Sequence, residues 1–457
     1  MSWNRVEVYI SVCAGVAGAV WVGISWSTKY RKPIKSERSG ITLQDLRNPA
    51  NREDHLAFNS MLLGKFPDVD AVRIDDELGG SEVFLVHKHR RVVEVISDHK
   101  SFTSNPWPWT RPLVTLNTMD KTDHDRVYKL LKRFYSPAAV KEISEKIDRI
   151  VSQHGPKLES DNDAYKFSKR VHMHLSLLTS GLVKELEPSS SIIDEFIEFN
   201  DASVRLAAPL GGVGSEPEFS FTRFRLVVRS LIASLSPVAR LCRRIGFFQT
   251  WRLLSPLESM FPSAPYTHCW DYPDDLPRIP MYFNRLYDLM STASIDSPAG
   301  QLYSNIGTNV SPSEALATAV QLMVNMTTAN AIMSLIYRKT EDPSITPVSV
   351  LQRDAPLQRN PRRAVRDTKI GSVPIRSGSL ILLMLGSANE DCPAGGISMT
   401  FGFGLHHCLG RHLVVCELEA VDKWIAERRV SLIEPPQRLV GVDVGNWGFR
   451  SLKVRLS

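Results

Sequence analysis

Hydrophobic and polar residues alternate over residues 66–75 and 81–87, and this period of two predicts a pair of β-strands. A glycine pair at positions 79–80 favours a turn between them. From residue 88 to about residue 96 the apolar positions change to helical spacing. Three prolines within residues 105–112 exclude regular strand or helix pairing there and predict an irregular loop.

Helical spacing dominates the middle of the chain, over residues 123–186 and again over residues 191–206. Residues 315–337 carry no charged side chain and are long enough to cross a bilayer. Several polar residues interrupt that stretch, which favours a helix through the protein interior over one that faces lipid. The carboxyl-terminal part mixes short strands, such as residues 379–385, with one helix after Cys408. We therefore predict a mainly α fold with small β-sheets, in the α+β class.

Arginines are spread among apolar residues between positions 223 and 252. This pattern predicts an amphipathic pair of surface helices. Contact with anionic lipid is the alternative, and it depends on a membrane lying next to this segment.

Residues 8–26 contain no charge, and their number is close to the roughly 20 apolar residues that span a bilayer. Basic residues follow directly, so the positive-inside rule leaves the rest of the chain on the cytosolic side. A cleaved signal peptide is the alternative, but the apolar region is long for one and its leading charge is poor. We expect a single-pass anchor over residues 1–28, in the endoplasmic reticulum membrane, and a linker over residues 29–57. The basic residues are Lys29, Arg31, Lys32 and Lys35.

The hydrophobic content, net charge and cysteines of the chain limit the classes of function that we expect. The 457 residues are 43% hydrophobic, which is enough for a large core and argues against disorder. A net charge of +6 suits a membrane surface or an acidic protein partner. No recognisable nucleic-acid-binding module or phosphate loop accompanies that charge, so nucleic acid is not an expected partner. The six cysteines form no CxxC pair, which favours a reduced compartment.

The densest chemical signal is the run FGFGLHHCLGR over residues 401–411. Apolar residues recur at helical spacing after Cys408, so this cysteine lies where a loop enters a helix. Backbone N–H groups and the helix dipole at that point lower a thiol's pKa and favour thiolate. Gly402 and Gly404 let the loop turn tightly against a flat ligand. A thiolate in that position can be the axial ligand of heme iron.

Two other interpretations of Cys408 are weaker. A zinc site would need a second pair of ligands, and the adjacent His406, His407 and Cys408 have none at a suitable spacing. An inert buried cysteine is the usual fate of a lone Cys, but the surrounding glycines and histidine argue against it.

This run resembles the heme-binding loop of the cytochrome P450 family, FGxGxHxCxG, in the form common among its soluble bacterial members. The resemblance implies that Cys408 is the iron ligand, that His406 contacts a heme propionate and that Phe401 packs beside the sulfur. It also implies heme b as the cofactor. The matching residues are Phe401, Gly402, Gly404, His406, Cys408 and Gly410.

The resemblance extends to about residues 66–457 and is consistent with one heme domain over residues 58–457. It places Arg362 and His124 at propionate contacts. It also places the helix that begins near Asp123 at the face where an acidic electron donor docks, although its charges are equally consistent with a solvated helix face. Those charges are Lys121, Arg126, Lys129, Lys132 and Arg133.

Some family residues are replaced. Thr327 and Thr328 stand where the family carries its oxygen-activating threonine, but Met326 precedes them in place of an acidic residue. Asn325 or water could take over that proton route, and plain core packing of the methionines is equally consistent. Arg353 is present without its glutamate, because Val350 occupies that position. The segments before Arg353 and before Phe401 are also short for the family, and Tyr128 stands where an arginine often assists His124.

The leading interpretation is a heme-thiolate monooxygenase that oxidises an apolar small molecule of natural-product, terpenoid or lipid type. Its electrons would come from NADPH through a partner reductase. A heme-thiolate isomerase, dehydratase or cyclase that does not activate oxygen is the second interpretation. A degenerate, non-catalytic heme-binding paralogue is the third. The loop before Leu113 and the region from Pro209 to Arg229 are the expected substrate contacts, and neither identifies a compound.

Overall fold

The computed structural model describes residues 39–42, 45–46, 55–78, 81–104, 116–185, 187–211, 285–323, 327–394, 396–438 and 448–457. The expected anchor, the proline-rich loop at 105–112 and the arginine-rich segment at 223–252 lie outside these residues. The same holds for Met326 and Asn325.

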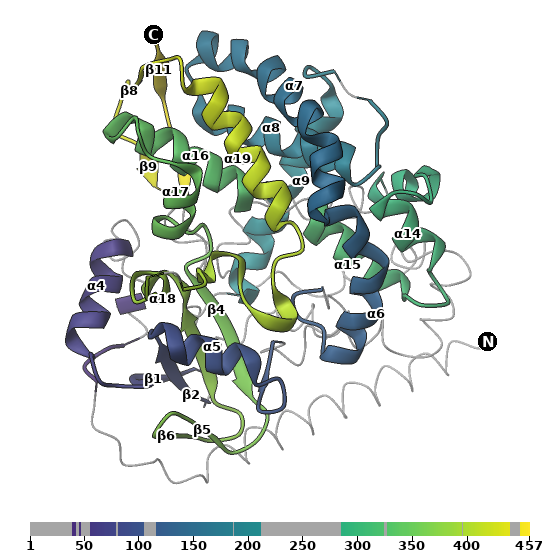
Figure 1. Cartoon of the computed structure of the whole chain (residues 1–457). Helices are drawn as coiled ribbons and strands as arrows, with labels where there is room; N and C mark the ends of the chain where they lie inside the picture. The colour runs from purple at the N-terminus through teal and green to yellow at the C-terminus, as the bar shows by residue number, and fades with distance from the viewer. Residues whose placement is uncertain are drawn as a thin grey trace, which may run out of the picture.

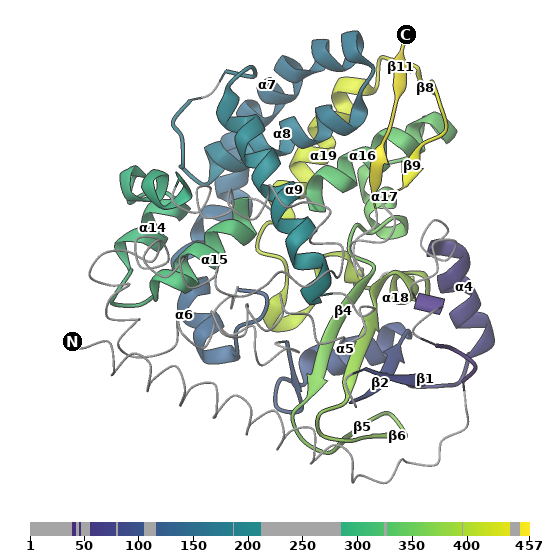
Figure 2. The same ribbon diagram turned by 180° about the vertical axis from the view of Figure 1, so that it is seen from behind.

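A five-stranded sheet lies at one side of the described fold, with most of the helices gathered on the other side (Figures 1 and 2). Its strand order is β1-β2-β7-β4-β3, in which β2 and β7 run parallel and the other neighbours are antiparallel. The strands are β1 (Val72–Leu78), β2 (Ser81–Val86), β3 (Phe102–Thr103), β4 (Arg359–Ala364) and β7 (Leu380–Met384).

The predicted hairpin is confirmed, but its first strand begins at Val72 rather than at residue 66. The preceding residues form a turn after helix α4 (His55–Lys65), where the Phe66 N–H bonds the Leu62 carbonyl over 3.0 Å. The predicted strand at 379–385 is also confirmed. All five residues of β7 are buried, which is typical of a strand covered on both faces.

The helical middle of the chain divides at points that local hydrogen bonds explain. The Ser136 side chain accepts from the Ala139 N–H over 3.2 Å and caps α7, and Pro137 occupies the first turn. Asn162, with a left-handed φ of 55°, ends α7, and Asp163 caps α8. The helical elements between residues 89 and 211 are α5 (His89–Ser97), α6 (Lys121–Leu131), the 3-10 turn η2 (Lys132–Tyr135), α7 (Pro137–Asp161), α8 (Ala164–Thr179) and α9 (Ser191–Gly211).

The carboxyl-terminal half contributes helices and short hairpins around the centre of the molecule. Its helical elements are α14 (Pro298–Ser304), α15 (Pro312–Met323), α16 (Thr327–Glu341), α17 (Pro347–Arg353), α18 (Leu385–Glu390), η4 (Met399–Phe401), η5 (Gly404–His406) and α19 (Arg411–Ile425). Its short strands are β5 (Thr368–Ile370), β6 (Val373–Ile375), β8 (Val430–Leu432), β9 (Gln437–Arg438), β10 (Phe449–Ser451) and β11 (Val454–Leu456).

The largest apolar cluster joins α7, α8, α16 and α19, and it contains fully buried Ile147, Val171, Leu335 and Leu418. The chain that leads from η4 into α19 lies between this helical cluster and the five-stranded sheet (Figure 1). Elements from both halves of the sequence therefore frame the loop that carries Cys408.

One stretch, Glu314–Glu341, is long and apolar enough to cross a membrane by length and composition, and it includes residues 324–326, which lie outside the described residues. Of its most apolar window, 64% is buried inside the fold. This burial agrees with the expectation that the uncharged stretch at 315–337 runs through the protein interior.

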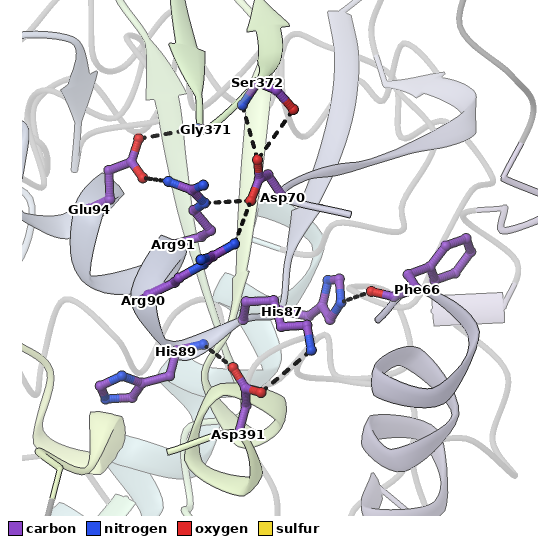
Figure 3. Close-up of polar contacts among 11 residues, drawn as sticks. Phe66, Asp70, His87, His89, Arg90, Arg91, Glu94, Gly371, Ser372 and Asp391 are labelled. Atoms are coloured by element: carbon purple, nitrogen blue, oxygen red, sulfur yellow. Dashed lines mark hydrogen bonds and ion pairs between the residues drawn. The ribbon is translucent and has the colours of Figure 1, made fainter. Parts of the chain in front are cut away.

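A polar network fixes the edge of the sheet to α5 (Figure 3). The Asp70 carboxylate accepts from Arg91 Nε over 2.6 Å and from the Ser372 N–H over 3.0 Å, so it ties α5 to the turn between β5 and β6. Close by, the Asp391 carboxylate accepts from the His89 N–H over 2.9 Å. Burial raises the pKa of Asp70, but the hydrogen bonds from Ser372 and Arg91 outweigh burial and leave that pKa below its usual value.

Candidate functional site

The loop before α19 is a tight structure that depends on two glycines. Gly402 and Gly404 have φ angles of 68° and 64°, a conformation that favours glycine. The Cys408 N–H donates to the Phe401 carbonyl over 2.7 Å, which closes the loop. A Cβ at Gly402 would lie 3.2 Å from the His406 carbonyl oxygen. The glycine spacing noted in the sequence is thus required by the backbone.

Cys408 lies just before α19, as expected, but its electrostatic environment differs from the expectation. Burial raises the pKa of the thiol, and this effect outweighs the opposing influence of the Gly410 N–H and the Arg411 charge. The prediction that the helix terminus lowers this pKa was therefore wrong, because desolvation dominates at a nearly inaccessible sulfur. Coordination to a metal cation deprotonates a thiol outright, so the site suits a bound iron better than a free thiolate.

A cluster of cationic and imidazole side chains flanks the loop. The His124 ring meets the His406 ring edge to face, with centroids 5.1 Å apart. Arg362 is 4% exposed and stands close enough to His406 to affect its charge. Burial, followed by the charge of Arg362, lowers the pKa of His406 to about 3, so this ring is neutral at pH 7. The structure therefore brings together three residues that are far apart in the sequence.

Arg362 is a buried cation without a carboxylate partner among the described residues. Its Nη1 donates to the Asn360 side-chain oxygen over 2.6 Å and to the Pro361 carbonyl over 2.8 Å. Burial lowers the pKa of Arg362 to about 10. Nδ1 of His124 is also buried, but it already lies 3.5 Å from the Asp125 carboxylate. An added anion would relieve the buried charge of Arg362, and the carboxylates of a heme fit this requirement.

Both ring nitrogens of His406 already have protein partners. Nε2 lies 2.8 Å from the Ser104 hydroxyl, and Nδ1 lies 3.2 Å from the Leu116 carbonyl oxygen. The ring thereby links the loop to the segments on either side of residues 105–115. In this arrangement Arg362, which donates to neutral acceptors, is better placed than His406 to bind an anion.

Sequence reasoning missed two residues near the site. The His99 ring lies 6.3 Å from the His406 ring, and burial together with the Arg362 charge lowers its pKa. Tyr135 is 7% exposed, and burial and then the nearby Cys408 raise its pKa. His99 lies outside any motif, so no local signal marked it. Tyr135 follows the basic residues Lys132 and Arg133, a pattern that indicated a charged surface and not a position near Cys408.

Thr327 and Thr328, the predicted catalytic threonines, open α16. Thr328 is 8% exposed, and Thr327 is half-buried. They directly follow residues 324–326, which lie outside the described residues.

Arg353 and Val350 do not form the polar pair that the family carries there. Val350 is completely buried in the largest apolar cluster, whereas Arg353 is exposed. Because Arg353 is solvated, it incurs no cost from lacking a glutamate. Phe401 packs at the edge of the same cluster, under the Arg411 guanidinium at 5.8 Å. Tyr128 stacks on His124, with ring centroids 5.3 Å apart.

The basic residues of α6 divide into two groups. Arg126 is engaged in ion pairs with Glu314, over 2.7 Å, and with Asp123, over 2.9 Å. The other basic residues of α6 and of the adjoining turn η2 are exposed, as is Arg411, the first residue of α19. The exposed cations are Lys121, Lys129, Lys132, Arg133 and Arg411.

No model of a protein family matches the sequence. Among curated proteins, the chain is 29% identical to cytochrome P450 133B1 of Xylella fastidiosa over 204 residues, which cover 37% of this chain and 48% of the relative. It is 22% identical to nocardicin C N-oxygenase of Nocardia uniformis subsp. tsuyamanensis, over 79% of this chain and 86% of the relative. The matches to the two Xylella fastidiosa strain 9a5c proteins span about half of each relative, 48% and 53%.

Solved structures with the same fold are found over most of the chain. CYP109E1 of Bacillus megaterium, solved in complex with testosterone, has a TM-score of 0.64 and 17% identity over 91% of this chain and 99% of its own. Cytochrome P450 PksS of Bacillus subtilis has a TM-score of 0.62 and 18% identity over 90% and 99%. At these identities the structures establish the fold. Together with the curated relatives and the loop that carries Cys408, they show that this chain belongs to the cytochrome P450 family.

Proposed function

We propose that this chain is a heme-thiolate monooxygenase that inserts one oxygen atom of O₂ into an apolar small molecule and releases the other as water, with two electrons and two protons supplied from outside. Two observations carry the proposal. Cys408 is a half-buried cysteine whose N–H closes its own loop, and Arg362 is a buried cation near His406 of that loop with no carboxylate partner among the described residues. A bound heme b would supply the redox chemistry at its iron, which the thiolate makes more electron-rich.

The described residues would have separate roles in binding the heme and in moving protons. Cys408 would hold the iron, while Arg362, together with His124 as the family resemblance implies, would contact the carboxylates. The hydrogen bond between the Cys408 N–H and the Phe401 carbonyl keeps the loop closed around the sulfur. Thr327 and Thr328, at the start of α16, would pass protons toward the oxygen-binding side.

The substrate class rests on the relatives. A 162-residue stretch is 30% identical to a steroid C26-monooxygenase of Rhodococcus jostii, and CYP109E1 was solved with the steroid testosterone. We extend this to an apolar natural product, terpenoid or lipid as the substrate of this chain.

The proposal also includes an electron donor and a membrane. We place an acidic, NADPH-dependent reductase partner against the exposed cations of α6 and Arg411. An anchor over residues 1–28 would hold the domain on the cytosolic side of the endoplasmic reticulum membrane. Carbonate extraction of expressing cells tests the anchor, since the full chain should stay with the membrane and a chain lacking residues 1–28 should not.

A carbon monoxide spectrum of the reduced full chain tests the heme site. Wild type should give the red-shifted Soret band typical of thiolate ligation, and Cys408→Ala should lose it. Cys416→Ala is the matched control, because Cys416 is a half-buried free cysteine on the following helix and should leave the band unchanged. A thiolate-type band that persists in Cys408→Ala, or a wild-type chain that binds no heme, would refute the proposal.

A second candidate is a heme-thiolate isomerase, dehydratase or cyclase, and Met326 favours it. A methionine cannot ionise, so it offers no proton at the position before Thr327. Product formation by the heme-loaded chain without reductant would select this candidate, whereas strict dependence on a reductase would select the monooxygenase. A wild-type chain that folds but does not take up heme would support the third interpretation, an inactive paralogue.

A further inference from the structure

Arg338 and Asp354 form a buried, two-pronged ion pair. Arg338 Nε lies 2.6 Å from Asp354 Oδ2, and Nη2 lies 2.8 Å from Oδ1. The Asp354 side chain is 0% exposed and that of Arg338 is 9% exposed. Burial acts to lower the pKa of Arg338, but the hydrogen bonds and charge of Asp354 outweigh burial, so its pKa is raised and the pair is charged at pH 7.

The pair joins the end of α16 to the end of α17. Asp354 follows the last residue of α17, and its N–H closes that helix by donating to the Val350 carbonyl over 2.7 Å. A seven-residue helix has little stability of its own in water, so its position depends on tertiary contacts. Loss of one partner of a buried ion pair leaves an uncompensated charge, which makes Arg338–Asp354 a strong restraint on α17.

Hydrogen bonds connect α17 to the loop that carries Cys408. The Thr400 hydroxyl donates to the Leu351 carbonyl over 2.6 Å. Leu351 is one turn before Asp354, and Thr400 directly precedes Phe401. The Phe401 carbonyl in turn accepts from the Cys408 N–H over 2.7 Å. The path therefore consists of two short hydrogen bonds, Thr400 to Leu351 and Cys408 to Phe401, joined by short stretches of the chain itself.

Two further contacts make the path rigid. The Asn389 side-chain oxygen accepts from the Met399 N–H over 2.6 Å, and its Nδ2 donates to the Thr400 hydroxyl over 3.0 Å. On the other side, Lys339 Nζ lies 2.7 Å from Asp422 Oδ1, so α16 is also tied to α19. Both ends of the Cys408 loop are therefore linked to α16, the helix that begins with Thr327 and Thr328.

We propose that Arg338 and Asp354 are positioning residues for the axial cysteine: by holding α17, they fix the Phe401 end of the loop through the Leu351–Thr400 hydrogen bond and keep the Cys408 sulfur at coordinating distance from the iron. The inference rests on the proposed ligation of heme by Cys408.

The test follows the ligation of the heme-loaded full chain. Asp354→Asn removes the charge, and Thr400→Val cuts the path without touching the ion pair. Asp201→Asn is the matched control, because it breaks a partly buried ion pair with Lys169, at 2.7 Å, that lies outside the path. The measured quantity is the rate at which the reduced carbonyl complex loses its thiolate-type Soret band at a fixed temperature, with helix content followed in parallel by circular dichroism.

Asp354→Asn and Thr400→Val should each lose the band about tenfold faster than wild type while helix content is retained, as expected for loss of a charge-assisted or buried hydrogen bond. Asp201→Asn should lose it at the wild-type rate. Because the two sites act in series, the double variant should be no faster than the faster single variant.

A wild-type rate in either single variant, or independent and multiplying effects in the double variant, would overturn the inference. If Asp354→Asn does not fold, Thr400→Val decides alone, and a wild-type rate in that variant overturns it. A wild-type chain that never shows the thiolate band refutes the proposed function itself, so the two failures are distinguishable.

Discussion

At the scale of single residues, Arg362 is the clearest sign that the fold is built around an anion. It is buried in β4 between an asparagine side chain and a backbone carbonyl, both neutral acceptors. Its neighbour Arg363, on the opposite face of the strand, instead donates to the Gly378 carbonyl over 2.8 Å. The two adjacent arginines therefore have different hydrogen-bond partners, on opposite faces of β4.

Arg362→Gln should release heme about ten- to a hundredfold faster than wild type, because a charge-assisted contact with a carboxylate is lost. It should not destabilise the heme-free protein, since the substitution removes a buried charge that has no counter-ion there. Heme transfer to apomyoglobin measures the first effect, and urea unfolding measures the second. Arg363→Gln is the control and should keep heme at the wild-type rate. The opposite ranking of the two variants would contradict the assignment of Arg362.

At the scale of elements, α7 continues through a sequence that disfavours helix. Gly155 and Pro156 lie together inside it, and both weaken an isolated helix. The glycine is explained by packing on α19, because a Cβ there would lie 2.2 Å from Cζ2 of Trp424. That ring is held in place by Phe167 at 5.7 Å and by Arg428 at 4.2 Å. Close contact between the two helices therefore takes precedence over local helix propensity.

Gly155→Ala should destabilise the protein by about 1–3 kcal/mol, the usual effect of overpacking a tight interface. Gly64→Ala is the matched control, since Gly64 is an exposed position of α4 with nothing within 4 Å of its added Cβ. That variant should be neutral or more stable by up to about 1 kcal/mol, because alanine favours helix. Urea unfolding of both variants gives the comparison. Stabilisation by Gly155→Ala would show that the α7–α19 contact is looser than described.

At the scale of the whole molecule, buried neutral histidines make the fold sensitive to acid. Nε2 of His154 on α7 lies 3.0 Å from Nδ1 of His174 on α8, and both residues are 1% exposed. Burial, followed by the charge of His174, lowers the pKa of His154 to about 3. A group whose folded pKa lies below its unfolded value of about 6.5 takes up its proton mainly on unfolding. Its contribution to stability is present above pH 6.5 and declines as the pH falls toward 3.

Stability of the heme-free chain should therefore fall between about pH 6.5 and pH 3. His154→Gln should remove up to about 1.4 kcal/mol per pH unit from that slope, the share of one proton. His412→Gln, at an exposed position, is the control and should leave the slope unchanged. Urea unfolding across the pH range gives the slopes. An unchanged slope in His154→Gln would contradict the assignment of a neutral, buried His154.

The sequence by itself determined the features that depend on near neighbours. Gly402 and Gly404 are required by the backbone of their own loop, and the helix after Cys408 follows from apolar spacing. The hairpin of β1 and β2 followed from alternation within a few residues. The break at Ser136 inside the predicted helical stretch 123–186 was not predicted, although a local cap explains it. Steric limits and capping bonds act over short stretches of chain, so the order of residues is sufficient to predict them.

Only the tertiary structure decided the features that depend on distant atoms. The parallel pairing of β2 with β7 joins segments about 300 positions apart, and no local pattern specifies it. Desolvation raised the pKa of Cys408 where its helix position alone predicted the opposite. Arg338 and Asp354 form a buried ion pair that the sequence pattern did not predict. Burial and ion pairing are set by which residues the fold brings together, so they follow from the packed structure and not from spacing along the chain.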